Sequence, residues 1–288
     1  MNLQDWIGRS ETVEDIATAT PYAALAATLD WPAAEGLNRP QRPPAGTPLP
    51  CLWHWLYFLP IAPQRDIGED GHPKRGGFMP PVPLPRRMWA GSDFEWSEPL
   101  LVGDALSRTS TILDVKEKSG RTGSLIFVTV RHEIRRNGAQ AVALTEHHNI
   151  VYRAAASADD VAPPPQAAPT AWAWERRIVP DDVLLFRYSA LTFNGHRIHY
   201  DRKYVTSVEG YPGLVVHGPL IATLLMDLLR RNLPDAAVIG FEFKAVRPTF
   251  DIHAFSVHGQ LSSDGKTVHL WGQDHEGWLT MDATATLA

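Results

Sequence analysis

The sequence predicts an α+β chain built from two similar modules, each with a helix near its start and an antiparallel strand meander after it. Two observations support this. Segments that alternate polar and apolar residues, mostly separated by Gly turns, fill 88–153 and recur at 237–286. An Ala/Pro-rich stretch lies between them. We therefore expect an N-terminal module over 1–155, a linker over 156–173 and a C-terminal module over 174–288.

The first module is expected to begin with a helix over 11–30, capped by Ser10 or Thr12 and interrupted at Pro21. An irregular Pro/Gly-rich segment and the aromatic run LWHWLYFL (52–59) follow, with Trp53, Trp55 and Tyr57 mostly in the core. Residues 61–85 form a Gly/Pro loop longer than a typical connection, and such loops are often functional. Strands are expected at 88–96, 106–120, 124–138 and 141–153.

The second module has a similar plan. A strand is expected at 174–178 and a short helix at 202–207. A longer helix lies within 214–231, with Leu220, Leu224 and Leu228 among its buried residues. Four strands follow, at 237–246, 253–261, 267–273 and 278–286.

Composition excludes several classes of protein. Of the 288 residues, 44% are hydrophobic and 20% are charged, which is typical of a globular protein. The net charge of −5 argues against nucleic acid as a partner. Cys51 is the single cysteine, so no internal disulfide is expected and a reducing, cytoplasmic setting fits best. No membrane partner is expected, because no apolar run approaches the ~20 residues that span a bilayer and no signal peptide is seen. A homodimer is compatible with the sequence, which does not fix the assembly.

One segment gathers groups that can move protons. Asn194, His196, His199 and Asp201 fall within eight residues, and His217-Gly218 then opens an apolar run. A helix start offers free N–H groups and the positive end of the helix dipole. Proton-transfer groups beside such a donor favour chemistry next to a carbonyl group.

This segment resembles a known family. LTFNGHRIHYD (191–201), followed by VVHGPL (215–220), is similar to the MaoC-type (R)-specific enoyl-CoA hydratases and hydroxyacyl-thioester dehydratases. With LWHWLYFLP and GEDGHPKRGGFMPPVPLPRRMWAG included, the chain resembles the two-module bacterial members that hydrate mesaconyl-CoA or itaconyl-CoA. The resemblance implies a double hotdog fold, an acyl-CoA thioester as substrate, and hydro-lyase activity without a cofactor.

The resemblance also assigns roles to residues. His199 matches the catalytic His, Gly218 matches the Gly whose N–H polarises the thioester carbonyl, and Asp201 matches an Asp two positions beyond the catalytic His. The catalytic Asp of the family falls on Asn194, and an amide cannot abstract a proton. Either His199 performs the proton transfers while Asn194 positions water, or another acid takes the missing role. His196 falls on the Asn of the family and is expected to orient its neighbours.

Each of these residues also has an ordinary structural interpretation. His199 alone would be a core histidine, Asn194-Gly195 is a turn dipeptide, and Gly218 suits close packing at a helix start. Asp201 is most simply the N-cap of the 202–207 helix. In the 61–85 loop, Asp70 and His72 form a second polar pair, for which we prefer a turn at Asp70-Gly71.

Basic residues are candidates for recognising a free carboxylate or the phosphates of coenzyme A, because arginine binds such groups in bidentate fashion. Arg86, Arg87 and Arg197 are the main candidates, with His217 and Trp89 lining the substrate site. The remaining histidines lack a pattern of metal ligands, so no metal is expected. A fatty-acid-type dehydratase, a non-catalytic acyl-CoA-binding hotdog protein and a thioesterase remain open as alternatives.

Overall fold

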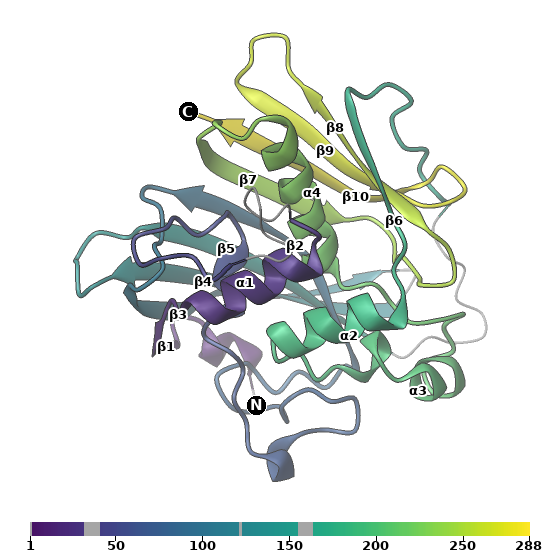
Figure 1. The fold of residues 1–288 in the computed structure, drawn as a ribbon. Coiled ribbons are helices and arrows are strands. Elements are labelled where there is room, and N and C mark those ends of the chain that lie inside the picture. Colours follow the sequence, from purple (N-terminus) through teal and green to yellow (C-terminus); the bar gives the residue numbers. More distant parts are fainter. Residues whose placement is uncertain (1, 32–40, 121–122, 155–163) are drawn as a thin grey trace.

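Ten strands form one antiparallel sheet in the order β1-β3-β4-β5-β2-β7-β10-β9-β8-β6 (Figure 1). The computed structural model describes residues 2–31, 41–120, 123–154 and 164–288. The strands are β1 (Ser10–Ile16), β2 (Arg86–Trp96), β3 (Ala105–Gly120), β4 (Gly123–Arg136), β5 (Leu144–Arg153), β6 (Trp174–Ile178), β7 (Val238–Ala245), β8 (Phe255–Leu261), β9 (Thr267–Gln273) and β10 (Leu279–Leu287). Both halves of the sheet have the same order from edge to centre, because β1 to β5 correspond to β6 to β10. The α+β double hotdog expected from the sequence is confirmed.

The halves join where β2 pairs with β7, and Phe94 lies opposite Phe241 at this seam. The described residues also form four α-helices: α1 (Ala19–Thr28), α2 (Asp182–Leu191), α3 (Arg202–Ser207) and α4 (Gly218–Asn232). In Figure 1, α1, α2 and α4 lie in front of the sheet. The leucines of α4 are buried against β8, β9 and β10, so this helix supplies the centre of the second module. The segment expected to link the modules falls partly on 155–163, outside the described residues.

The first module differs from the expectation at its start. Residues 11–30 do not form one helix: Ser10–Ile16 is an edge strand paired with β3, and only Ala19–Thr28 is helical. The strand was hidden because most of its side chains are exposed and polar, so no alternation marks it. Pro21 does not break α1, because it lies in the first helical turn, where a backbone N–H has no partner to lose.

Between α1 and β2, the first module has an aromatic segment where the second module has α4. Leu52, Trp53, Leu56, Tyr57 and Phe58 are all buried there, around the short 3-10 helix η2 (Trp53–Leu56). The expectation that this run belongs mostly to the core is confirmed. Among the described residues, α4 is the longest helix, and its N-terminus is partly accessible.

A buried carboxylate ties the modules together at the far end of α4. Asp227 is 1% exposed and forms ion pairs with Arg176, Arg230 and Arg231. Arg176 and Arg231 also donate to the Leu29 carbonyl oxygen, at 2.9 Å each, just beyond the end of α1. These arginines satisfy carbonyl groups that a helix end leaves free.

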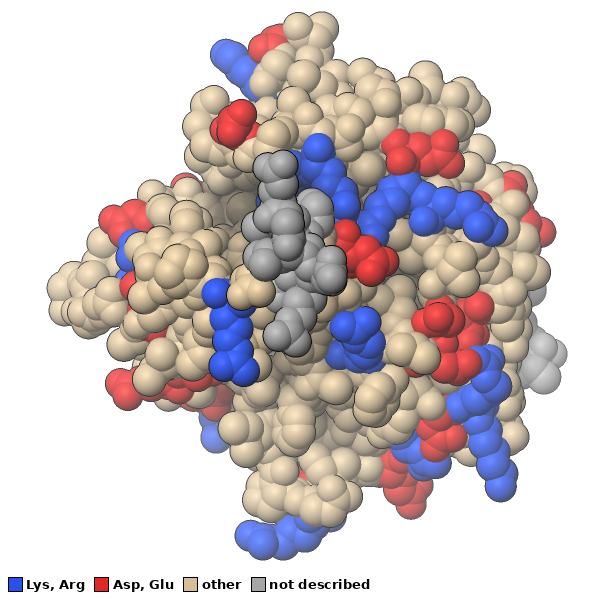
Figure 2. All heavy atoms as spheres, viewed as in Figure 1, with Lys and Arg blue, Asp and Glu red and all other residues tan. Residues whose placement is uncertain are grey.

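Basic and acidic side chains are interspersed over the face shown in Figure 2 rather than separated into large areas of one sign. This agrees with the small negative net charge. Among the described residues, no helix combines the length and the apolar character needed to cross a bilayer.

Candidate active site

The connection between α2 and α4 folds into a compact polar segment. Phe193 takes a left-handed conformation (φ 49°) as α2 ends, and the Asn194 Oδ1 then accepts a hydrogen bond from the His196 N–H at 3.0 Å. The 3-10 helix η4 (Arg197–His199) follows, and α3 begins directly after Asp201. The turn that Asn194-Gly195 favours therefore places His196 and His199 on one short loop.

His199 is held in one tautomer. Its side chain is buried, and its Nδ1 donates to the Val215 carbonyl oxygen at 2.7 Å. Because a carbonyl oxygen only accepts, the proton of the neutral ring must lie on Nδ1, and Nε2 is left as a proton acceptor. The His199 ring stacks on His217, with the ring centroids 3.8 Å apart.

His217 lies deeper than the sequence suggested. We expected it to line the substrate site, but it is fully buried, and its Nε2 lies 2.8 Å from the Ser189 Oγ on α2. The apolar core around the start of α4 encloses this ring, and its stacking fixes the position of the His199 ring. Ser189 lies 28 residues away along the chain, so no local pattern indicates this contact.

Burial keeps these rings neutral. Burial, with a smaller contribution from His196, lowers the pKa of His199 to about 3. Burial and then His72 lower the pKa of His196 to about 3, and burial and His199 place the pKa of His217 well below its usual range. A neutral His199 is therefore available as a base across the neutral pH range.

Gly218 presents a free donor at the start of α4. It is the first residue of the helix, its N–H has no acceptor within the described chain, and Pro219 after it has no N–H. A Cβ added to Gly218 would have Met281 Cε, 4.0 Å away, as its nearest neighbour. The first turn of α4 therefore offers a free N–H at the positive end of the helix dipole, and the space beside the Gly218 Cα is open.

Asp201 is occupied elsewhere. One of its carboxylate oxygens accepts from the Tyr204 N–H at 2.9 Å, and the other pairs with Arg197 at 2.7 Å. The N-cap that the sequence suggested is confirmed, and both oxygens are used in it and in the ion pair. The geometry therefore does not support the catalytic role that we had predicted for Asp201.

A loop of the first module docks onto this segment. The Arg197 N–H donates to the Asp70 carbonyl oxygen at 2.9 Å. Gly71 has a φ of 90°, and a Cβ there would lie 1.8 Å from the Gly195 carbonyl oxygen. The predicted turn at Asp70-Gly71 is confirmed, and Gly is required because of both its conformation and this close approach.

Docking brings Asp70 and His72 to the histidine cluster. His72 Nδ1 lies 3.0 Å from Asp70 Oδ2, and the His72 ring packs on His196 with centroids 4.1 Å apart. Although burial alone would raise the pKa of the Asp70 carboxyl, the hydrogen bonds from His72 hold it well below its usual range. Asp70, His72 and His196 each offer a ligand atom within 4.8 Å of the others. Because Asp70 and His72 already bind one another directly, we interpret them as a hydrogen-bonded pair.

The three candidate arginines differ in their contacts. Arg197 pairs with Asp201 and donates to the Glu69 carbonyl oxygen, and Arg86 pairs with Glu209. Arg87 is half-buried on β2, and its guanidinium group has no hydrogen-bond or ion-pair partner in the part of the chain that the structure describes.

The surroundings of Arg87 connect both modules. Burial is the main cause of the lowered pKa values of His196 and His148. The positive charge of Arg87 lowers both pKa values further, by less than burial does. Trp89 is two residues along the same strand and packs on the His148 ring, with centroids 4.0 Å apart. Alternate residues of a strand share a face, so Arg87 and Trp89 lie on one side of β2. This pairing of Trp89 with His148 was not predicted.

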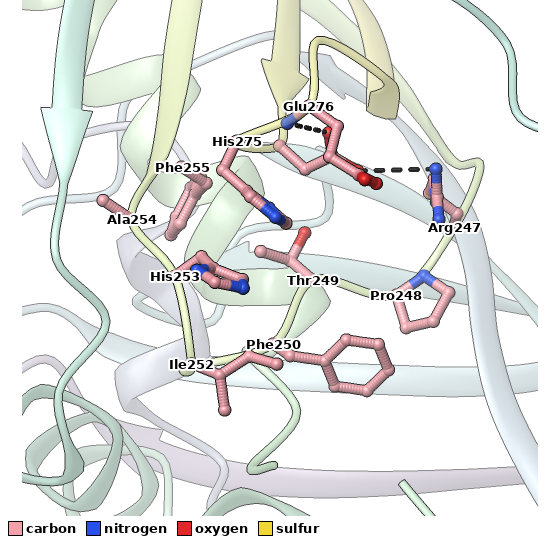
Figure 3. Close-up of a pocket in the computed structure, with 11 residues that line it drawn as sticks. Arg247, Pro248, Thr249, Phe250, Ile252, His253, Ala254, Phe255, His275 and Glu276 are labelled. Carbon is pink, nitrogen blue, oxygen red and sulfur yellow. Dashed lines mark hydrogen bonds and ion pairs between the residues drawn. The ribbon is translucent and has the colours of Figure 1, made fainter. Parts of the chain in front are cut away.

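A separate cavity lies between the segments 247–255 and 274–276 (Figure 3). Its lining includes Arg247, Thr249, His253 and His275, and the two histidine rings stack with centroids 3.7 Å apart. The Val216 N–H donates to the Thr249 carbonyl oxygen, so the cavity adjoins the strand-like segment that holds His199. His199, His196 and His72 do not line it, and we do not place the reaction there.

The chain is similar to known proteins along most of its length. The sequence profile of the hydroxyacyl-thioester dehydratase type 2 family matches residues 52–251. The chain is 44% identical over 282 residues to the mesaconyl-C(4)-CoA hydratase of Chloroflexus aurantiacus, covering 98% of this chain and 96% of that protein. It is 27% identical to the mitochondrial hydroxyacyl-thioester dehydratase type 2 of Schizosaccharomyces pombe, over 69% of this chain and 73% of that one.

Among solved structures, a MaoC-like dehydratase from Phytophthora capsici matches with a TM-score of 0.67 at 13% identity, covering 100% of this chain and 99% of that chain. This likeness supports the double hotdog fold. Together with the profile match and the full-length similarity in sequence, it shows that the chain belongs to the hydroxyacyl-thioester dehydratase type 2 family and is a hydro-lyase.

Proposed function

We propose that the protein adds water across the double bond of an α,β-unsaturated CoA thioester whose short acyl chain carries a free carboxylate, as mesaconyl-CoA and itaconyl-CoA do. One observation carries this proposal. A neutral His199 stacks on His217 beside the start of α4, and neither its Nε2 nor the Gly218 N–H has a hydrogen-bond partner among the described residues. A base next to an oxyanion donor is the arrangement that addition to an enoyl thioester requires.

In this mechanism the thioester carbonyl oxygen accepts the Gly218 N–H. The His199 Nε2 takes a proton from water as the water oxygen bonds to the β-carbon. The electrons of the double bond move towards the carbonyl and form an enolate, which the helix dipole and the N–H stabilise. Protonation of the α-carbon then completes the addition of water.

Asn194 is assigned to positioning that water. Its Oδ1 is engaged by the His196 N–H, while no partner within the described residues takes up its Nδ2. The amide can therefore donate to a water molecule, but it cannot accept a proton from it.

Asn194→Asp is expected to lower kcat by about threefold to tenfold, the effect of losing one hydrogen bond of ordinary strength. The carboxylate still accepts from the His196 N–H, so the turn should persist, which melting temperature will check. Steady-state hydration kinetics give the measurement. A rise of several-fold would show instead that a carboxylate at this position supplies a missing acid.

Arg87 is the residue assigned to the free carboxylate of the substrate. A carboxylate that enters a partly closed pocket needs a charged partner, because an unpaired buried charge is costly. Of the three candidate arginines, Arg87 alone has an unpaired guanidinium among the described residues, and it lies near His196. The similarity to the mesaconyl-C(4)-CoA hydratase favours the same acyl class.

Arg87→Met is expected to raise KM for mesaconyl-CoA or itaconyl-CoA by about 10- to 100-fold, because a hydrogen bond to a charged group contributes about 1.5–3 kcal/mol. KM for crotonyl-CoA, which lacks the carboxylate, should change little. Arg86→Met is the matched control, since it removes the neighbouring arginine that pairs with Glu209. Equal losses on both substrates would contradict the assignment.

A fatty-acid-type 3-hydroxyacyl-thioester dehydratase is the second candidate, favoured by the similarity to the Schizosaccharomyces pombe enzyme. A panel of enoyl-CoA esters separates the candidates when loss of the enoyl-thioester absorbance and release of free thiol are followed together. We expect the highest kcat/KM with a five-carbon dicarboxylyl ester and no thiol release. A preference for crotonyl-CoA or longer chains would favour the second candidate, and binding without turnover would show an acyl-CoA-binding protein.

A further inference from the structure

The hydration mechanism leaves one proton without a donor. The enolate must receive a proton at its α-carbon, yet the side chains that the second module places at the site do not supply it. Asn194 is an amide, and Asp201 is used by Tyr204 and Arg197. His196 is a neutral ring, and a neutral imidazole is a base rather than a useful acid. His199 is already assigned to the water that adds at the β-carbon, and a second group on the α-carbon lets it return that proton to solvent.

We propose that His72, oriented by the Asp70 carboxylate, is the catalytic acid that protonates the α-carbon, so that the first module completes the active site of the second. This inference rests on the proposed function. His72 is the catalytic residue in it, and Asp70 is a positioning residue.

The position of the pair supports this role. His72 packs on His196, whose ring lies 5.4 Å from that of His199, so the acid and the base are separated by a single ring. The His72 side chain is 24% exposed, so substrate and solvent can both reach it. His217, by contrast, is sealed in the core.

The loop is fixed as a catalytic group requires. Besides its bond to the ring, Asp70 accepts the His72 backbone N–H on Oδ1 at 3.0 Å. The backbone of Asp70 accepts the Arg197 N–H, the Glu69 carbonyl oxygen accepts the Arg197 side chain, and Gly71 lies against Gly195. The pair is therefore attached to the same residues that position His199.

The chemistry balances over one cycle. The protonated His72 gives the proton on Nε2 to the α-carbon of the enolate, while its Nδ1–H stays on Asp70, whose negative charge stabilises the protonated ring. A C–H bond forms, the carbonyl is restored, and His72 becomes neutral. His199 then releases to solvent the proton it took from water, and His72 takes one from solvent, so the net change is the addition of one water molecule.

His72→Gln tests the proposal most directly. It keeps a side chain of similar reach and leaves Asp70 and its backbone contacts in place. We expect kcat to fall by about 100- to 10,000-fold, with KM changed less than threefold and the melting temperature preserved. Glu69→Gln is the control, because its exposed side chain has no partner in the described residues and should leave kcat unchanged.

Asp70→Asn adds a readout that a merely structural role would not move. The amide still accepts the backbone N–H but no longer stabilises a protonated His72. We therefore expect kcat to fall by about tenfold or more, while KM changes less than threefold and the melting temperature is preserved.

The outcomes separate this inference from the proposed function. If the wild-type protein does not hydrate any enoyl-CoA ester, the proposed function fails. If the wild type turns over and either His72→Gln or Asp70→Asn keeps more than a third of its kcat, the inference fails alone. Loss of wild-type activity after dialysis against EDTA, restored by a divalent cation, would also overturn it, because Asp70, His72 and His196 would then act as a metal site.

Discussion

Replacing His199 with alanine should lower kcat by about 100- to 10,000-fold, because general acid–base groups contribute about that much to rate. The free Nε2 of this ring is the base that takes the proton from water in our mechanism, and water alone replaces it poorly. KM should change far less, since the ring is assigned to the attacking water rather than to binding the substrate. Hydration kinetics with the best ester of the panel give the measurement.

A suitable control removes another buried ring of the same module. His258 is 1% exposed, bonds to Ser256 and stacks on Trp271, away from the cluster. His258→Ala should reduce stability but spare kcat. If His199→Ala kept more than a third of the wild-type kcat, His199 would not be the base.

Gly218→Pro is expected to lower kcat by about 100- to 1,000-fold, the usual effect of removing one oxyanion donor. Proline has no N–H, yet it is well tolerated at the first position of a helix. His217 before it is extended (φ −60°, ψ 128°), as a residue before proline prefers to be. The helix should therefore form normally while the donor is lost.

Gly218→Ala is the matched variant that keeps the N–H. Its Cβ would be 4.0 Å from the nearest heavy atom, an ordinary contact, so the enzyme should retain activity within a few-fold. Equal kcat values for the proline and alanine variants, both well folded by melting temperature, would exclude the Gly218 N–H as the oxyanion donor.

Local sequence patterns predicted most of the sheet. Trp174–Ile178 and Thr267–Gln273 were placed with their observed bounds, because Gly, Pro or polar turns flank short alternating runs. Asp201 and the helix Arg202–Ser207 were also placed correctly, since capping depends on adjacent residues.

Two elements escaped prediction for physical reasons. Ser10–Ile16 is an exposed edge strand, which needs only one paired neighbour and no apolar face. The helix α2 (Asp182–Leu191) exposes Val183 and Phe186 at 62% each, so its apolar residues do not mark a single buried face. Patterning predicts an element only when one face of it is buried.

The residues of the proposed site could be named from one segment of the sequence, but their partners in the first module could not. Asn194, His196 and His199 lie on one short loop, and the His199 ring stacks on His217, directly before Gly218. Asp70 and His72 reach the proposed site because two tight turns meet, with Gly71 against Gly195. These two glycines are 124 residues apart along the chain. Nothing in the local pattern of either turn specifies that contact. Choosing Arg87 over Arg86 and Arg197 likewise required knowing which guanidinium groups are already paired.

Addition of water to an enoyl-CoA thioester leaves a defined label in its product when the reaction runs in D2O. The purified protein is incubated with mesaconyl-CoA or itaconyl-CoA in D2O, and the acyl-CoA product is examined by mass spectrometry and NMR. We predict a hydroxyacyl-CoA that carries one new hydroxyl group and one carbon-bound deuterium that does not wash out in H2O. Recovery of unchanged enoyl-CoA, or release of free coenzyme A without a hydroxyacyl-CoA product, would contradict the account.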